Sequence, residues 1–334
     1  MNGTYQEGHT VILIKTQEAI EEVGLKIGII GTGAVGSACI LSVILRGCAR
    51  EIVLIDKARQ RAQAVAIDMH YGSPHSPTVD VRGGDYADLN GAAVVMITAG
   101  VNEKTGGAID RSDPAGRLRL LETNVKVYEE IVPQIVKSAP EAVIMVVTDP
   151  PDPLADITRH LAGHDRVVST GTLLDSLRFQ VHLARKLSVN AASIEALVVG
   201  EHGTSQVFLW SSARVGGAPF CDLLEQCDAA PAAFRAQVES EVRYANITII
   251  EGNNASQYGI GMTCARIAEM IMRDENAVVP VGSYNENYGV TLSLPSVLGS
   301  HGVKRILQPE MNDEERVMLQ HSAEKLKSAL RGRI

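Results

Sequence analysis

The chain of 334 residues has only five cysteines, and they exclude two classes of site. They are odd in number, widely spaced and form no C-x-x-C pair, so neither a disulfide framework nor a structural zinc site is expected. His160 and His164 stand four positions apart, but Gly163 and Asp165 indicate a helix end there rather than a metal site. The sequence predicts no bound metal, and its cysteine usage is typical of the reducing cytoplasm.

Long apolar runs and an excess of positive charge are also missing. The longest apolar runs, such as 142–147, are far shorter than the ~20 residues that cross a bilayer, so no membrane span is expected. The N-terminus does not have the basic, apolar and small-residue order of a secretory signal. Lys and Arg number 31 against 39 Asp and Glu, and this net charge of −8 has the wrong sign for a nucleic-acid partner. A globular cytoplasmic protein is therefore expected.

Short apolar segments alternate with helical stretches from residue 26 onward. The expected strands cover 26–30, 52–55, 79–81, 94–98, 143–147 and 167–169. Segments that are apolar throughout are typical of strands buried on both faces, and intervening helices make such strands parallel. We therefore predict an α/β fold with a doubly wound parallel sheet over residues 26–170, preceded by an N-terminal arm at 1–25.

A second, mixed α/β domain is predicted for residues 171–334. Its expected helices cover 175–186, 231–251 and 256–273, and its strand-like pieces cover 196–199, 206–210, 278–281 and 289–294. Asn312 followed by Glu315 predicts the start of a terminal helix. The apolar face of that helix is expected to carry Val317, Ala323, Leu326 and Leu330.

A glycine motif follows the first expected strand. Gly31, Gly33 and Gly36 have the G-x-G-x-x-G spacing, and Asp56 stands 20 residues after Gly36 at the end of the second expected strand. This combination is typical of a Rossmann dinucleotide-binding domain, in which the first glycine makes a tight turn, the second admits the pyrophosphate and the third lets helix meet strand. The carboxylate accepts hydrogen bonds from the adenosine ribose and would repel a 2′-phosphate. The cofactor predicted is NAD rather than NADP.

Two further segments are candidates for chemistry. His202 lies in Gly200-Glu201-His202-Gly203, and Asp175 and Arg178 share one face of a predicted helix. A surface or core histidine and a structural ion pair are the alternatives for these residues. The second segment, 101–116, is a polar, glycine-containing loop after a strand, where open α/β sheets bind ligands. Arg117 and Arg119 follow it, and one or both are expected to close over a substrate.

The order of these motifs resembles the L-lactate/malate dehydrogenase family over about residues 26–330. The match is carried by 31–36, Asp56, Thr98-Ala99-Gly100, Arg117-Leu118, 175–179 and 200–203. It implies an NAD-dependent homo-oligomer of two or four subunits, in which Thr98, Ala99 and Gly100 also contact the cofactor. It further implies that His202 exchanges the proton, Asp175 orients it, Arg178 holds the substrate carboxylate and Arg117 polarises the carbonyl.

Four positions near the substrate need separate comment. Asp149 stands where the family usually has an asparagine, and Ser256 stands where it usually has a threonine. Glu103 occupies the position where glutamine accompanies lactate enzymes and arginine accompanies malate enzymes. The loop that contains Arg111 is several residues longer than usual, as in family members that accept bulkier 2-oxo acids.

The resemblance implies an L-lactate-type dehydrogenase that acts on a small 2-oxo or L-2-hydroxy acid. Because Glu103 would repel a second carboxylate, pyruvate or a larger monocarboxylic acid is expected to be preferred over oxaloacetate. One alternative is a malate dehydrogenase in which Arg111 binds the second carboxylate. Another is a weakly active NAD-binding oligomer, because an ionised Asp149 cannot donate a hydrogen bond.

Overall fold

One large sheet organises the chain. The computed structural model describes residues 25–113, 115–225 and 231–334, and the predicted N-terminal arm lies outside them except for Leu25. Within this part of the chain, nine strands form a sheet in the order β14-β13-β12-β6-β5-β4-β1-β2-β3. Its strands are β1 (Lys26–Ile30), β2 (Glu51–Ile55), β3 (Asp80–Gly83), β4 (Ala92–Ile97), β5 (Val143–Val146), β6 (Val167–Ser169), β12 (Ala277–Asn285), β13 (Val290–Gly299) and β14 (Gly302–Ile306).

The strands β1 to β6 are parallel, as predicted. Their side chains are apolar on both faces because both faces are covered: Ile27 and Ile29 pack into one core, and Ile30 packs into the other. The predicted α/β class and all six predicted parallel strands are confirmed, with ends that differ by one or two residues.

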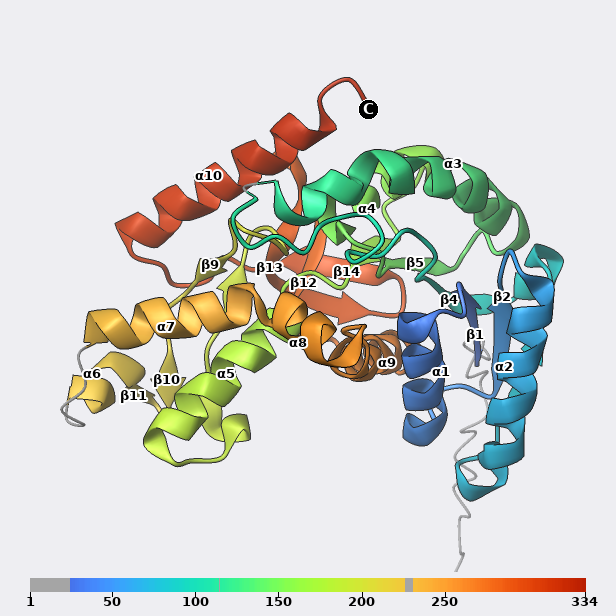
Figure 1. Cartoon of the computed structure of the whole chain (residues 1–334), viewed down its shortest axis with the longest axis horizontal. Helices are drawn as coiled ribbons and strands as arrows, with labels where there is room; N and C mark the ends of the chain where they lie inside the picture. The colour runs from blue at the N-terminus through green and yellow to red at the C-terminus, as the bar shows by residue number, and fades with distance from the viewer. Residues whose placement is uncertain (1–24, 114, 226–230) are drawn as a thin grey trace, which may run out of the picture.

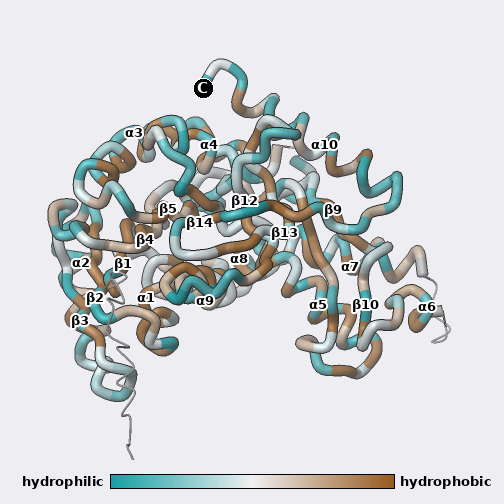
Figure 2. Tube along the Cα trace, turned by 180° about the vertical axis from the view of Figure 1, so that it is seen from behind, coloured by the Kyte–Doolittle hydropathy of each residue, from teal (hydrophilic) through white to brown (hydrophobic). Residues whose placement is uncertain are grey.

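Helices cover the two faces of the sheet. The core on one face contains α1 (Ala34–Arg46), α2 (Arg59–Gly72) and α9 (Tyr258–Met272). The core on the other face contains α3 (Leu121–Ser138), α4 (Pro151–Ala162) and α10 (Asp313–Leu330). Figure 2 shows hydrophobic residues alternating with hydrophilic ones along α3 and α10, as expected for helices with one buried side. No helix of the described residues is long and apolar enough to cross a membrane.

The antiparallel strands β12, β13 and β14 extend the parallel sheet from the C-terminal half. β12 pairs with β6 through Gly282 and Ser169. A Cβ at Gly282 would lie 2.0 Å from the Ser169 hydroxyl, so this junction requires glycine. β12 and β13 are longer than predicted, and β14 was not predicted. The sheet therefore continues past residue 170 into the C-terminal half.

Most of the remaining elements lie at the end of the molecule opposite α1 and α2, while α8 lies nearer the middle, beside α9 (Figure 1). The helices are α5 (Leu173–Leu187), α6 (Phe220–Glu225), α7 (Pro231–Arg243) and α8 (Ala245–Asn253). Two small sheets contain β7 (Ile194–Glu195), β8 (Val198–Val199), β9 (Val207–Phe208), β10 (Arg214–Val215) and β11 (Ala218–Pro219). The long helix predicted over 231–251 is two helices, interrupted at Tyr244.

The phenylalanines and the tryptophan are concentrated at this end. All four phenylalanines of the chain and its only tryptophan contact one another in the core beneath α5 and α7. The ring of Phe179 meets those of Phe208 and Trp210 edge to face, at centroid distances of 5.2 and 4.7 Å. These five side chains thus form a compact core in the part of the molecule where the strands are short.

The terminal helix α10 begins as predicted. The side chain of Asn312 accepts the Glu315 N–H at 2.9 Å, and the Glu315 carboxylate accepts the Asn312 N–H at 3.0 Å. Ala323, Leu326 and Leu330 are buried, but the prediction for Val317 is wrong, since it is 69% exposed. The buried stripe runs through Leu319, and a residue two positions away lies about 200° around a helix.

Candidate active site

A cavity opens at the carboxyl ends of the central strands. Gly31 follows β1, Thr98 follows β4 and Asp149 follows β5, so the three lie at one edge of the sheet. The predicted residues that line the cavity are Thr98, Gly100, Glu103, Arg117, Asp149, Arg178, His202 and Ser256. The chain thus brings together side chains from both halves of the sequence at the edge where open α/β sheets bind ligands.

The glycine loop has the shape that a dinucleotide requires. Gly31 has φ +99°, and a Cβ there would lie 2.6 Å from the backbone nitrogen of Ala99. A Cβ at Gly36 would lie 2.0 Å from the Gly31 carbonyl oxygen, which accepts the Thr98 hydroxyl at 2.8 Å. At Gly33, by contrast, a Cβ would meet none of the described residues within 4 Å. Backbone N–H groups at the start of α1 are therefore open to a pyrophosphate.

Asp56 lies beside this loop at the end of β2. Its carboxylate accepts the Thr32 N–H at 2.8 Å, the Thr32 hydroxyl at 2.9 Å and the Ala58 N–H at 2.9 Å. Burial acts to raise the pKa of Asp56, but the hydrogen bonds from Thr32 and Ala58 outweigh it, so the pKa lies below its ordinary value. An ionised acceptor is thus fixed next to the loop, which is the chemistry that a ribose hydroxyl needs.

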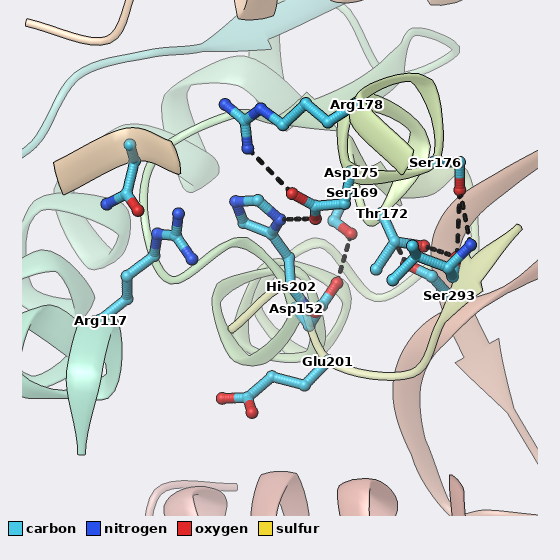
Figure 3. Close-up of polar contacts among 12 residues, drawn as sticks. Arg117, Asp152, Ser169, Thr172, Asp175, Ser176, Arg178, Glu201, His202 and Ser293 are labelled. Carbon is cyan, nitrogen blue, oxygen red and sulfur yellow. Dashed lines mark hydrogen bonds and ion pairs between the residues drawn. The ribbon is translucent and has the colours of Figure 1, made fainter. Parts of the chain in front are cut away.

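His202 is held by a buried carboxylate. Its Nδ1 lies 2.5 Å from Oδ2 of Asp175, and Oδ1 of Asp175 accepts Nη1 of Arg178 at 2.9 Å (Figure 3). Burial acts to raise the pKa of Asp175, but His202, Arg178 and Arg117 lower it to about 2. The ionised Asp175 keeps the Nδ1–H of the ring toward itself, so Nε2 faces the cavity.

A second buried acid positions the backbone of the same loop. Asp152, in the first turn of α4, accepts the His202 N–H at 2.7 Å and the Ser169 hydroxyl at 2.7 Å. Burial raises the pKa of Asp152 to about 6, against the effect of these hydrogen bonds. The neighbouring Glu201 accepts Nζ of Lys325 at 3.2 Å. No sequence motif pointed to Asp152, because it acts on His202 from 50 positions away.

Of the two arginines after the long loop, only Arg117 enters the cavity. It lies on a 3-10 helix (Gly116–Leu120), and its side chain is 9% exposed. Its Nε lies 3.3 Å from Oδ2 of Asp149, yet makes no hydrogen bond to the described residues. Arg119 instead pairs with Asp113 at 2.6 Å and is mostly exposed, so of the two arginines expected to close over a substrate, Arg117 is the one placed to do so.

Asp149 and Glu103 face the same cavity. Oδ1 of Asp149 lies 3.9 Å from Nε2 of His202, so this acid is beside the ring nitrogen that faces the cavity. Two asparagines that the sequence analysis missed hold the pair. Asn246 of α8 donates to Glu103 at 3.4 Å, and the buried Asn124 of α3 donates to the Asp149 carbonyl oxygen at 2.7 Å.

Arg111 is the one predicted substrate residue that lies away from the others. Its guanidinium makes a two-pronged ion pair with Glu251 of α8, at 2.7 and 2.8 Å, and both side chains are exposed. Lys104 donates to Asn254 at 2.8 Å nearby. These contacts attach the loop 101–116 to α8, and they leave the Arg111 charge outside the cavity.

Together these features define the class of protein. A dinucleotide loop with its acidic partner lies beside a histidine oriented by a buried carboxylate and beside two buried guanidinium groups. Among the described residues, no group of three or more His, Cys, Asp or Glu side chains could hold a metal ion. The chain is an NAD-dependent oxidoreductase with a Rossmann-type sheet.

Comparison with known proteins gives the family. Residues 25–169 match the NAD binding domain of lactate/malate dehydrogenases, and residues 172–332 match their alpha/beta C-terminal domain. The chain belongs to the lactate/malate dehydrogenase family. This finding confirms the family resemblance and the predicted NAD cofactor.

Individual relatives cover nearly the whole chain. An L-lactate dehydrogenase of Thermus aquaticus is 43% identical over 315 residues, which are 91% of this chain and 98% of the relative. An L-lactate dehydrogenase of Deinococcus radiodurans is 41% identical over 301 residues, 90% of this chain and 96% of the relative. The solved structure of the minor L-lactate dehydrogenase from Enterococcus mundtii matches with a TM-score of 0.84 at 33% identity, covering 92% of this chain and 98% of that one.

Proposed function

We propose that the chain interconverts a monocarboxylic 2-oxo acid and the corresponding L-2-hydroxy acid with NADH and NAD, as an L-lactate-type dehydrogenase. The observation that carries this proposal is the set Arg178–Asp175–His202 with Arg117 around one cavity beside the glycine loop. The similarity of the chain to the L-lactate dehydrogenases of Thermus aquaticus and Deinococcus radiodurans supports it.

Each side chain has a physical task in this reaction. Arg178 offers two parallel N–H donors to the substrate carboxylate, which fixes the face that the carbonyl carbon presents. NADH supplies the hydride when it is bound. As negative charge grows on the carbonyl oxygen, Arg117 stabilises it and Nε2 of His202 donates its proton to it. Asp175 stays ionised and stabilises the imidazolium before that transfer.

The residues that line the cavity with Arg117 favour a substrate with one carboxylate. Glu103 lines it, whereas Arg111 is paired with Glu251 outside it. A carboxylate that faces another at about 4 Å costs on the order of 1 kcal/mol in water and about 4 kcal/mol in a partly shielded site. We therefore expect oxaloacetate to be a poorer substrate than pyruvate or 2-oxoisocaproate, and the Arg111-based malate dehydrogenase to be disfavoured.

A panel of 2-oxo acids with NADH tests the proposal. We expect pyruvate or 2-oxoisocaproate to give the highest kcat/KM, and Glu103→Arg to shift the ratio toward oxaloacetate. His202→Asn should lower kcat by about 10²-fold or more with little change in NADH affinity. Preference for oxaloacetate that disappears in Arg111→Ala would establish a malate dehydrogenase. Weak turnover of every acid, with tight NADH binding, would establish the weakly active oligomer.

We also propose a homo-oligomer, in the cytoplasm, built from the two domains 26–170 and 171–334. Exposed apolar side chains on α1, α2 and α9 support an association between copies; they are Leu41, Leu45, Ile67, Tyr71, Tyr258 and Met262. The cysteines at 39, 48, 221 and 264 are free, which suits a reducing compartment. Sedimentation velocity of the wild type and of Leu45→Glu tests the association.

A further inference from the structure

The residue before His202 is a buried acid to which the proposed reaction gives no task. Glu201 is 3% exposed, does not line the cavity, and points away from the ring of His202 (Figure 3). Its carboxylate accepts the Ser205 N–H at 2.9 Å and also accepts the Ser205 hydroxyl. A Cβ at Gly203 would lie 2.6 Å from this carboxyl group, so the turn 200–203 is closed tightly around it. The side chain of Glu201 thus shapes the turn that carries His202.

A cation from the terminal helix α10 meets this acid. Nζ of Lys325 lies 3.2 Å from Oε2 of Glu201 and also donates to the hydroxyl of Thr204. The side chain of Glu201 is 4% exposed and that of Lys325 is 21% exposed, so water reaches little of the pair. A buried charge that loses its partner is strongly destabilised. The two side chains therefore hold each other in place.

A second contact joins the same turn to α10. The hydroxyl of Ser322 accepts the Glu201 N–H at 2.8 Å, and Ser322 is fully buried. Ser322 stands three positions before Lys325, so the two side chains share one face of the helix. Gly200 has φ +84°, and a Cβ there would lie 2.7 Å from the Ser322 hydroxyl. The turn is thus bound to α10 through its backbone and through its buried acid.

We propose that Lys325 and Glu201 are positioning residues for the reaction, because their ion pair fixes the turn 200–203 against α10 and so holds Nε2 of His202 at the cavity. This inference rests on the proposed function. Asp175 orients the ring of His202, whereas the ion pair acts on the backbone that carries it. A displacement of about 1 Å at a reacting group can lower a rate by about 10²-fold. An ion pair outside the cavity therefore has a direct effect on turnover.

Lys325→Met removes the cation, and kcat is expressed per NADH-binding site, counted by fluorescence titration, so that unfolded protein does not enter. We expect kcat for reduction to fall by about 10- to 100-fold. KM for the 2-oxo acid and the NADH affinity should stay within about threefold, because Arg178 lies on α5 and the glycine loop lies before α1. Lys325→Arg keeps the cation and should stay within about threefold of the wild type in kcat. If Lys325→Met does not fold, Lys325→Gln is judged by the same measurements.

The two side chains should behave as one unit. Glu201→Gln keeps an oxygen that can accept from Ser205 but removes the charge that Lys325 neutralises, so kcat per site should fall by about tenfold or more. The double variant Glu201→Gln/Lys325→Met should lose no more than Lys325→Met alone, since the contact is already gone. Losses that add independently would contradict the ion pair as their cause.

Glu315→Gln is the matched control on the same helix. Glu315 is also 3% exposed, and its carboxylate accepts the Ser211 N–H at 2.9 Å and the Ser211 hydroxyl. It therefore copies the burial and the serine contacts of Glu201 at the other end of α10, away from the turn 200–203. We expect it to lower the melting temperature and to leave kcat per NADH-binding site within about threefold of the wild type.

Hydrogen exchange of the backbone amides in the NADH complex, measured by mass spectrometry, reads the same contact without turnover. Lys325→Met should speed exchange in a peptide covering 200–205 by about tenfold or more, and Glu315→Gln should not. Unchanged exchange in that peptide, wild-type kcat per site in Lys325→Met, or an equal loss of kcat in Glu315→Gln would each overturn the proposal. Absence of turnover with every 2-oxo acid would refute the proposed function, and the exchange of 200–205 would still decide whether Lys325 holds the turn.

Discussion

Asparagine in place of Asp175 keeps the size of the side chain and removes the charge that two cations share. In the wild type, Asp175 is 1% exposed and contacts Nδ1 of His202 at 2.5 Å and Nη1 of Arg178 at 2.9 Å. The imidazolium form of His202 would lose its counter-charge. The guanidinium of Arg178 would remain charged and would repel the imidazolium of His202.

The size of the effect follows from the geometry. Two unit charges about 4 Å apart attract by about 1 kcal/mol in water and by about 4 kcal/mol in an environment of effective dielectric constant near 20. The second value suits Asp175 because the group is buried. Since 1.36 kcal/mol is a factor of ten, Asp175→Asn should lower kcat/KM for reduction by roughly 10²- to 10³-fold near neutral pH.

The change is measured from the steady-state rate at which the preferred 2-oxo acid oxidises NADH across pH. A fluorescence titration gives the NADH affinity separately. Asp152→Asn is the matched control, because Asp152 binds the His202 backbone N–H and does not touch the ring. We expect the control to stay within about tenfold of the wild type. If Asp175→Asn keeps kcat/KM within about threefold of the wild type, or loses only NADH affinity, the electrostatic role given to Asp175 is incorrect.

Three further predictions concern other residues. Arg178→Lys should raise KM for the 2-oxo acid by about tenfold or more, because lysine keeps the charge but loses the two-pronged geometry; a loss confined to NADH affinity would contradict this. Asp56 should make kcat/KM with NADPH at least about tenfold lower than with NADH, and equal efficiencies would rule out its assigned role. Burial raises the pKa of Asp156 to about 6, above its value in the unfolded chain, so this group stabilises the fold at low pH and loses that contribution as pH rises toward 6. Between pH 5 and pH 7, urea unfolding should therefore show the wild type losing about 1 kcal/mol relative to Asp156→Asn, and a constant difference would contradict the shift.

Local sequence patterns were sufficient for the parallel strands and the glycine loop. β1 is apolar throughout, and Gly31 follows it directly, so both the strand and its turn are visible within a few residues. The pairing of the proposed catalytic residues depended on the family resemblance, because Asp175 and His202 are 27 positions apart and spacing alone cannot join them.

The elements that were missed depend on tertiary contacts. Asn246 meets Glu103 across 143 positions, and neither belongs to a local motif for the contact. β7, β10 and β11 have two residues each, which is too short for any periodicity to appear. Val317 was misplaced because apolar character alone does not fix the angular position of a helix stripe.

The junction between β6 and β12 has a mechanical consequence. Main-chain pairing continues from the parallel strands into β12 and β13, so the two halves of the chain contribute to one continuous sheet. A hinge motion between the two halves would have to break the backbone pairing of β6 with β12, where Gly282 packs against Ser169. By contrast, the exposed ion pair of Arg111 and Glu251 joins the loop after β4 to α8 through side chains alone. Separating Arg111 from α8 would break exposed side-chain contacts, whereas separating β6 from β12 would break backbone pairing.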